Sequence, residues 1–154
     1  DVQFANTVLE WFTKGGFDRL IIIDGLVKPD KKGEQGDLFG VGSISTAREM
    51  LTKAGVEPIQ QGVVAGICGY LLSEGERLGL DITAILAECS PMYPDARAAA
   101  LAIEAVSELI GIEIPLSSLI EDARAIENSV QEIFENAQNA LPAPEDTSSD
   151  PSFG

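Results

Sequence analysis

Apolar and polar positions follow one another along this chain in blocks that predict helices and strands in turn. Residues 19–24 (RLIIID) are almost continuously apolar, as in a short strand that is covered on both faces. Residues 58–64 and 81–88 predict two further strands. Residues 4–14 predict a helix whose apolar stripe ends at a glycine pair; the stripe consists of Phe4, Val8, Leu9, Trp11 and Phe12.

Three more helices are expected between and after these strands. Two short ones are predicted at about 45–53 and 66–77, each followed by a glycine. A longer, alanine-rich helix is expected to begin at Pro94, with Asp95 in its first turn, and to stop at Gly111. Because strands and helices alternate, we expect an α/β fold with three layers and a mostly parallel sheet.

The corner at residues 88–95 (ECSPMYPD) raises the question of an active site. Pro91 blocks continuation of the strand and Pro94-Asp95 starts the next helix, so the corner has a structural explanation. Tyr93 is the residue there whose chemistry this explanation leaves unused.

The last helix is predicted from Ser118 to Gln138, where Ser118 and Glu121 are spaced as a capping box. Its apolar positions alternate steps of four and three, and Ile120 and Phe134 widen the stripe. That stripe predicts packing on the domain's own sheet or a helix–helix seam with another subunit, and the pattern is too short to choose. Its members are Leu119, Ala123, Ile126, Val130, Ile133 and Ala137.

Two segments carry no periodic pattern. Residues 25–42 are rich in glycine and charge and predict a long, mobile loop. Residues 139–154 (NALPAPEDTSSDPSFG) are rich in proline, serine and acid and predict a disordered acidic tail. We therefore expect one α/β domain over residues 1–138 and a tail over 139–154.

Charge and composition exclude several classes of function. The net charge is −15, which disfavours binding to nucleic acid or to anionic lipid. No apolar run is long enough to span a membrane, and no leader opens the chain, so a cytoplasmic protein is expected. The chain has no histidine, which removes the commonest general base and zinc ligand. Cys68 and Cys89 are interpreted as buried small hydrophobic residues.

Candidate chemistry is limited to a few positions. Asp24 ends an apolar strand, where α/β sheets bind ligands, so a crevice near Asp24, Gly42 and Glu88 is the candidate ligand site. The glycines of GVVAGICG (Gly62, Gly66 and Gly69) are spaced unlike a phosphate loop and are assigned to close helix–sheet packing. Asp30, Glu34 and Asp37 offer carboxylates for a metal, but interleaved lysines weaken that site. We predict no cofactor.

The order of the segments, and one dense motif within it, resemble the proteasome assembly chaperone 2 family in its archaeal form. The motif reads GxxGxLLxEGxRxGxD, then a strand ending in Glu, then Tyr-Pro-Asp and an alanine-rich helix. The resemblance extends over residues 4–136. Its residues are Gly66, Gly69, Leu71, Leu72, Glu74, Gly75, Arg77, Gly79, Asp81, Glu88, Tyr93, Pro94, Asp95, Ala98, Ala99 and Ala100.

The resemblance implies a nucleoside-phosphorylase-like fold, a homo-oligomer, and a non-enzymatic role in building the proteasome core particle. Some members bind the proteasome α-subunits through a C-terminal hydrophobic–tyrosine–any-residue tail, whereas this chain ends Ser152-Phe153-Gly154. Relatives carry further strands and a helix ahead of the matched region, so the domain is expected to be incomplete at its N-terminus.

The expected partner contacts are Ile126, Val130, Ile133, Phe134, Phe153 and Gly154. The alternatives are a small-molecule or nucleotide-binding protein or enzyme on the same scaffold, for which an ATP-grasp label exists among relatives, and a structural homo-oligomer with other partners.

Overall fold

The fold is that of a computed structural model, which describes residues 2–29, 36–59 and 64–140. Within the last helix it describes the backbone alone of residues 123, 127, 131, 134, 135 and 138–140. The helices are α1 (Val2–Lys14), α2 (Ser45–Lys53), α3 (Gly66–Leu78), α4 (Ala96–Ile110) and α5 (Ser117–Ala140). The strands are β1 (Leu20–Val27), β2 (Leu38–Gly42), β3 (Glu57–Pro58) and β4 (Ile82–Cys89).

The described strands form a four-stranded sheet in the order β1-β4-β2-β3. β1 lies parallel to β4 along its full length, from Leu20 opposite Ile82 to Val27 opposite Cys89. β2 runs antiparallel to β4, and the short β3 lies parallel to β2. The predicted α/β fold is confirmed, with two of the three strand pairs parallel and the β2–β4 pair making the sheet mixed.

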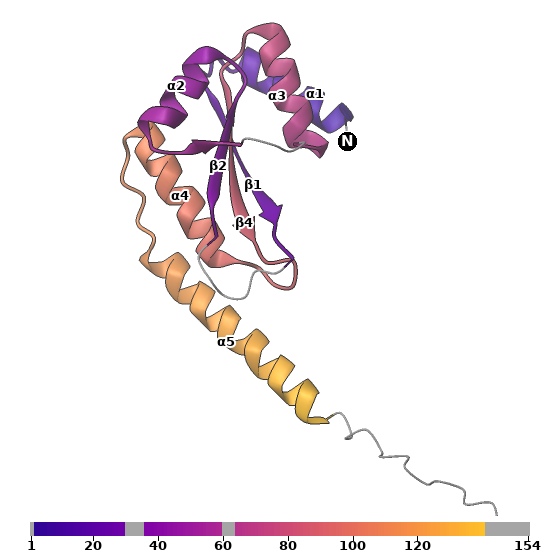
Figure 1. Cartoon of the computed structure of the whole chain (residues 1–154). Coiled ribbons are helices and arrows are strands. Elements are labelled where there is room, and N and C mark those ends of the chain that lie inside the picture. The colour runs from indigo at the N-terminus through magenta and orange to yellow at the C-terminus, as the bar shows by residue number, and fades with distance from the viewer. Residues whose placement is uncertain (1, 30–35, 60–63, 141–154) are drawn as a thin grey trace, which may run out of the picture.

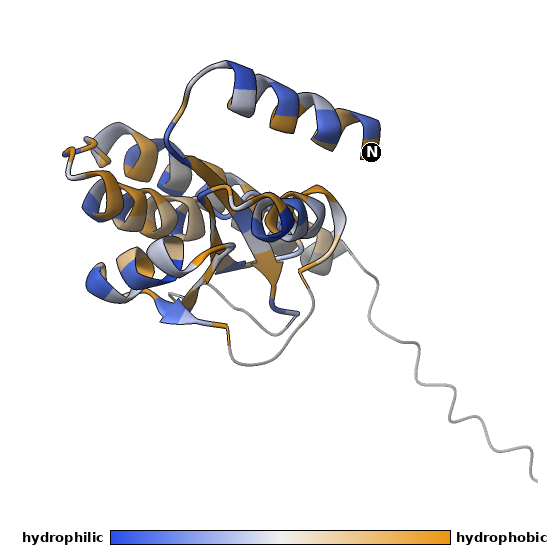
Figure 2. Cartoon of the chain, turned by 90° about the horizontal axis from the view of Figure 1, so that it is seen from above, coloured by the Kyte–Doolittle hydropathy of each residue, from blue (hydrophilic) through white to orange (hydrophobic). Residues whose placement is uncertain are grey.

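The core lies on both faces of β4, whose side chains alternate between two hydrophobic clusters. Ile82, Ala84 and Leu86 pack with α1 and α3, while Ile85 and Ala87 pack with α2 and α4. Figure 1 shows this three-layer arrangement, with α2 and α4 on one side of the sheet and α1 and α3 on the other. Figure 2 shows the apolar strands enclosed between the helices.

The segment 25–42 differs from the predicted loop, because β1 continues to Val27 and residues 38–42 form β2. The glycine content of this segment predicts a loop, but two of its glycines are needed for close packing. A Cβ on Gly40 would lie 2.6 Å from Leu51 Cδ2. A Cβ on Gly42 would lie 2.7 Å from the Arg48 nitrogen. Both glycines therefore let α2 lie close on β2, which only the tertiary structure reveals.

The strand predicted at 58–64 is also different. Of its described residues only Pro58 belongs to a strand, the two-residue β3, Glu57–Pro58. Residues 60–63 lie outside the described part of the chain. Helix α1 buries a narrower stripe than predicted, which consists of Ala5, Leu9 and Phe12. Phe4 and Trp11, which belong to the predicted stripe, are more than half exposed.

Candidate functional site

Helix α5 carries the candidate partner contacts, and it leaves the body of the molecule. Figure 1 shows it running away from the end of the domain at which α4 begins. Its main contact with the rest of the fold is with α4, and no strand is among its main neighbours in the described residues. Of the two arrangements that the stripe predicts, packing on the domain's own sheet is therefore not what the structure shows.

The apolar stripe of α5 is open to solvent over its second half. Ile126 is 41% exposed and Ile133 is 67% exposed, while Val130 between them is half-buried. These three residues follow one another at steps of four and three, so they lie on one face of the helix. The side chain of Phe134 is not among those described, and Phe153 and Gly154 lie outside the described residues.

The start of α5 is anchored where it meets α4. Leu116 and Ile120 line a groove of about 370 Å³ together with Leu101 of α4, and Arg97 and Arg124 also line it. The helix begins at Ser117, and the amide of Ile120 donates to the carbonyl of Leu116. Ser118, predicted as the first capping residue, therefore lies inside the first turn.

The three residues of the predicted ligand crevice do not come together. Asp24 lies opposite Leu86 and Glu88 opposite Leu26, toward one end of the sheet. Gly42 lies opposite Thr83 at the other end of β4, because β2 is antiparallel. From Thr83 to Glu88 the strand advances about 17 Å. The sequence predicts a loop at residues 25–42, whereas Gly42 belongs to β2, which carries it to the far end of β4.

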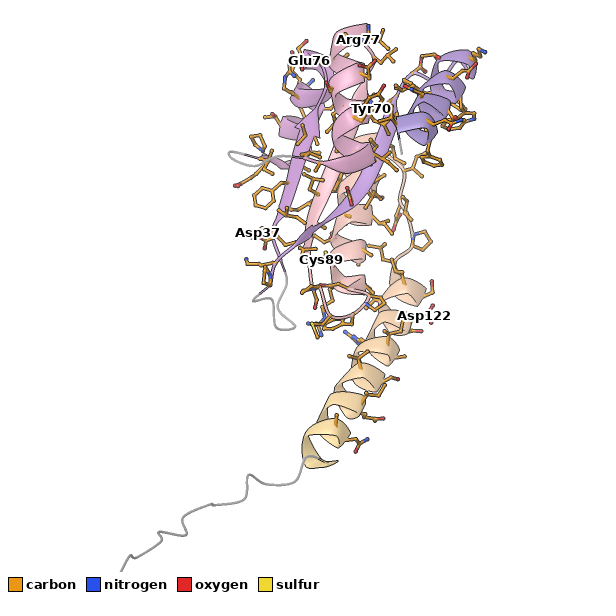
Figure 3. The ribbon with its side chains drawn as sticks, turned by 90° about the vertical axis from the view of Figure 1, so that its right-hand side faces the viewer. Asp37, Tyr70, Glu76, Arg77, Cys89 and Asp122 are labelled. Atoms are coloured by element: carbon orange, nitrogen blue, oxygen red, sulfur yellow. The ribbon has the colours of Figure 1, made fainter. Side chains whose placement is uncertain are left out.

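Glu88 holds the polypeptide that crosses between β1 and β2. Its carboxylate accepts hydrogen bonds from Lys28 Nζ at 2.8 Å and from the Asp37 amide at 3.0 Å. Lys28 follows β1 and Asp37 precedes β2, so one largely buried carboxylate joins both sides of the crossing. Figure 3 shows Asp37 and Cys89 at this end of the sheet, away from the end where Arg77 and Tyr70 lie.

Asp24 lies beside an apolar cavity. Its carboxylate accepts a hydrogen bond from the Gly25 amide at 2.8 Å. Next to it a cavity of about 310 Å³ separates β1 from α4, lined by Ile23, Cys89, Ala98, Ala99 and Ala102 among others. Aliphatic surface dominates this cavity, so it suits apolar side chains better than a phosphate or a sugar.

The corner between β4 and α4 is a helix cap, as its sequence indicates. Asp95 precedes α4, and its carboxylate accepts from the amides of Ala98 at 3.0 Å and Ser90 at 3.1 Å. Helix α4 begins at Ala96, so Asp95 is the N-cap and Pro94 stands before it, outside the helix that the sequence predicts it to begin. Tyr93 is half-buried at this corner.

Cys68 and the glycine Gly69 serve the structure of the fold. Burial, and secondarily the Asp24 carboxylate, raises the pKa of the Cys68 thiol to about 11, which keeps the thiol protonated at neutral pH. A Cβ on Gly69 would lie 1.9 Å from the Val64 carbonyl oxygen, so Gly69 serves the approach to α3. Helix–sheet packing depends instead on Gly75, where a Cβ would lie 2.9 Å from Ile82 Cδ1.

Metal clusters and membrane spans are both absent from residues 2–29, 36–59 and 64–140. Within these ranges no group of three His, Cys, Asp or Glu is placed to hold a metal, and Asp30 and Glu34 lie outside them. None of the described helices is both long and apolar enough to cross a membrane.

Known proteins resemble this chain in sequence. The model of the PAC2 family matches residues 1–134, which confirms the resemblance carried by the motif. An uncharacterized protein of Methanocaldococcus jannaschii is 33% identical over 103 residues, which are 67% of this chain and 43% of that protein.

Two solved structures of Pyrococcus furiosus proteins share the fold. PbaA, an archaeal homolog of proteasome-assembly chaperone, matches with a TM-score of 0.74 and 25% identity, over 90% of this chain and 62% of PbaA. PbaB, an archaeal proteasome activator, matches with a TM-score of 0.73 and 24% identity, over 84% of this chain and 56% of PbaB. The chain thus spans less than two thirds of the length of each of these relatives.

Proposed function

From the premise that this chain belongs to the PAC2 family, we propose that it acts by protein–protein contacts in assembly of the proteasome core particle, with α5 as its main contact element. The role is chaperone-like and does not involve catalysis. Its partners are further copies of the chain and proteasome α-subunits. The likeness to PbaA, a homolog of proteasome-assembly chaperone, supports the choice of client.

The observation that carries the proposal is the exposed face of α5. Helix α5 leaves the domain with Ile126, Val130 and Ile133 on one face. Contact of this apolar face with water is unfavourable, and a partner that covers the face would lower the free energy. The helix has 24 residues, about 36 Å of length, so it offers several turns to a partner helix. Isoleucine and valine at steps of four and three suit knobs-into-holes packing against such a helix.

The polar groups of the candidate crevice support contacts rather than chemistry. Glu88 ties the crossing between β1 and β2, and Asp24 accepts a hydrogen bond from the Gly25 amide. Each carboxylate is thus engaged in holding the fold. The C-terminal residues Phe153 and Gly154 remain a second proposed contact, in which the aromatic ring of Phe153 enters a pocket of the α-subunit ring.

The test replaces two isoleucines of the exposed face by Ile126→Asp and Ile133→Asp together. We expect a smaller assembly in size-exclusion chromatography with light scattering, because each aspartate would bury a charge in the seam. We also expect loss of α-subunits from a pull-down with purified proteasome α-subunits. A version that ends at Ser149 tests the tail in the same pull-down.

The matched control is Ala125→Asp with Asn128→Asp, which adds the same charge at positions about 100° or more around the helix from Ile126. Both control positions are exposed, so the fold and the assembly should be unchanged. An unchanged size and unchanged capture in the isoleucine variant, with its circular dichroism intact, would contradict the role of α5. Capture of no α-subunit by the unmodified chain would contradict the choice of client.

A further inference from the structure

The groove of about 370 Å³ between α4 and the start of α5 combines apolar surface with positive charge. Leu101, Leu116 and Ile120 supply the apolar surface, and Ile120 is 37% exposed. Arg97 and Arg124 line the same groove at exposed positions. Such a surface suits an apolar segment that also carries carboxylates, because its apolar side chains gain from burial and the opposite charges attract.

The positive charge of this groove is unusual for so acidic a chain. The chain has 25 acidic and 10 basic residues. Among the described residues that line the groove, two are arginines and one, Glu104, is acidic, which leaves one positive charge in excess. The groove is therefore a place where a strongly negative molecule attracts an acidic segment.

The second half of α5, residues 125–140, has the matching chemistry. It carries three glutamates and no basic residue. Its apolar face includes the exposed Ile126 and Ile133, which lie ~10.5 Å apart along the helix axis. The part of α5 that lines the groove, from Leu116 to Arg124, is about 12 Å long. The apolar face and the groove are thus similar in length and opposite in charge.

The second half of α5 does not reach the groove of its own chain. Leu116, Ile120 and Arg124 line that groove, and the helix continues from them without a break to Ala140. Residues 126–133 therefore lie farther along the same axis, about 9 to 20 Å beyond Ile120. Figure 1 shows α5 leading away from the domain. The groove of one copy can accept this part of the helix only from another copy.

We propose that the second half of α5 of one copy docks in the α4–α5 groove of another copy. Ile126 and Ile133 would lie on the apolar surface of the groove, and the glutamates of the docked helix would lie near Arg97 and Arg124. The proposal rests on the proposed function, in which α5 is a contact element between copies, and it identifies the surface that α5 meets. The contact is heterologous, because two different surfaces of the chain meet in it.

Charge favours the groove over a seam formed by two α5 helices alone. Helix α5 carries five acidic residues and one arginine, so its net charge is −4. Two such helices side by side would repel one another. The groove adds Arg97 and Leu101 of α4 to the contact, and these residues supply positive charge and apolar surface from outside α5.

Complementation between two variants tests the contact. The groove variant carries Arg97→Glu and Arg124→Glu, and the helix variant carries Ile126→Asp and Ile133→Asp. Each variant lacks one of the two surfaces, so each should sediment as a single chain in about 0.15 M salt, at a concentration at which the unmodified chain assembles. Their mixture should form a 1:1 pair, because the intact α5 of the groove variant meets the intact groove of the helix variant. We expect the two variants to bind each other at least tenfold more tightly than either binds itself.

Two controls separate loss of the contact from loss of the fold. Arg97→Lys with Arg124→Lys keeps both positive charges and should assemble like the unmodified chain. Arg97→Glu alone changes α4 and leaves α5 intact, so it should weaken assembly through the groove and leave a seam between α5 helices unaffected. Glutamate is favourable in the first turn of a helix, where Arg97 lies, so this variant should fold. Circular dichroism and urea midpoints check the fold of each variant.

The outcomes distinguish this contact from the proposed function. A groove variant that assembles like the unmodified chain would overturn the groove as acceptor and leave α5 as a contact element. Variants that fold but form no pair when mixed would likewise overturn it, in favour of a seam between α5 helices. A helix variant with unchanged assembly would contradict the proposed function as well. If the unmodified chain stays a single chain and the groove variant loses only its capture of α-subunits, the groove belongs to the client, and the proposal is overturned.

Discussion

At the scale of single residues, burial of Cys68 makes the stability of the fold vary with pH in the alkaline range. Its thiol pKa lies near 9 in an unfolded chain and at about 11 in the fold, because burial disfavours the thiolate. The folded state therefore holds the thiol proton more tightly than the unfolded chain does. The stability that this difference contributes is complete below pH 9 and is lost as pH rises toward 11. We expect the urea midpoint of the wild type to fall more steeply over this pH range than that of Cys68→Ala. Parallel curves for the two proteins would contradict this.

Single residues also show what can be predicted from sequence. The sequence places Asp95 at the second position of the helix, two positions too far along, because Asp is favoured by the helix dipole and as an N-cap alike. Glycines that are needed for packing are harder to identify from sequence. The sequence around Gly40, Gly69 and Gly75 does not reveal which atom packs against each of them. Only the tertiary structure shows that Ile82 makes Gly75 necessary.

At the scale of elements, the cap of α4 is a testable contribution. Asp95→Ala would remove the acceptor for the Ala98 amide and for the Ser90 amide, which lies where β4 ends. We expect a loss of about 1 kcal/mol in the free energy of unfolding, the usual cost of deleting an N-cap. Asp95→Asn keeps one oxygen, which can accept from the Ala98 amide, but its NH2 group cannot replace the second oxygen that accepts from Ser90. This variant should therefore lose less stability than Asp95→Ala. Urea titrations compare the two, and equal losses would contradict a contribution from the hydrogen bond to Ala98.

The helices can be predicted more closely than the strands. Helical spacing and terminal glycines mark α1, α2, α3 and α4 to within about two residues. β2 escapes prediction because it has five residues, two of them packing glycines, and pairs with β4 rather than with its sequence neighbour β1. For α5 the pattern identifies the apolar face, but only the fold shows that no strand of the sheet covers it in the described residues.

At the scale of the whole molecule, the dense motif that carries the resemblance maintains the fold. Asp81 forms an ion pair with Arg19 at 2.8 Å, Gly79 ends α3 in the left-handed conformation, and Asp95 caps α4. The partner-contact surface is less predictable, because the residues of the motif hold the fold together and do not form that surface. Partner contacts depend on which apolar surface remains uncovered, and that is a property of the assembled layers rather than of any short pattern.

Net charge makes stability depend on salt. With 25 acidic and 10 basic residues, the folded chain repels itself, and the Debye length falls from about 30 Å at 0.01 M salt to about 3 Å at 1 M. The ion pairs Glu10–Lys14 and Glu74–Arg77 lie at the surface, so salt removes little stability by screening them. We therefore expect NaCl between about 0.01 and 1 M to raise the urea midpoint.

A charge-reduced variant tests whether carboxylates of α5 contribute to this repulsion. Glu121→Gln, Asp122→Asn and Glu132→Gln together remove three negative charges at exposed positions of the helix and leave its apolar stripe unchanged. The rise of the midpoint with salt should be smaller in this variant, because less repulsion remains to be screened. A midpoint that falls with salt, or an equal rise in both proteins, would mean that repulsion among these carboxylates does not limit stability.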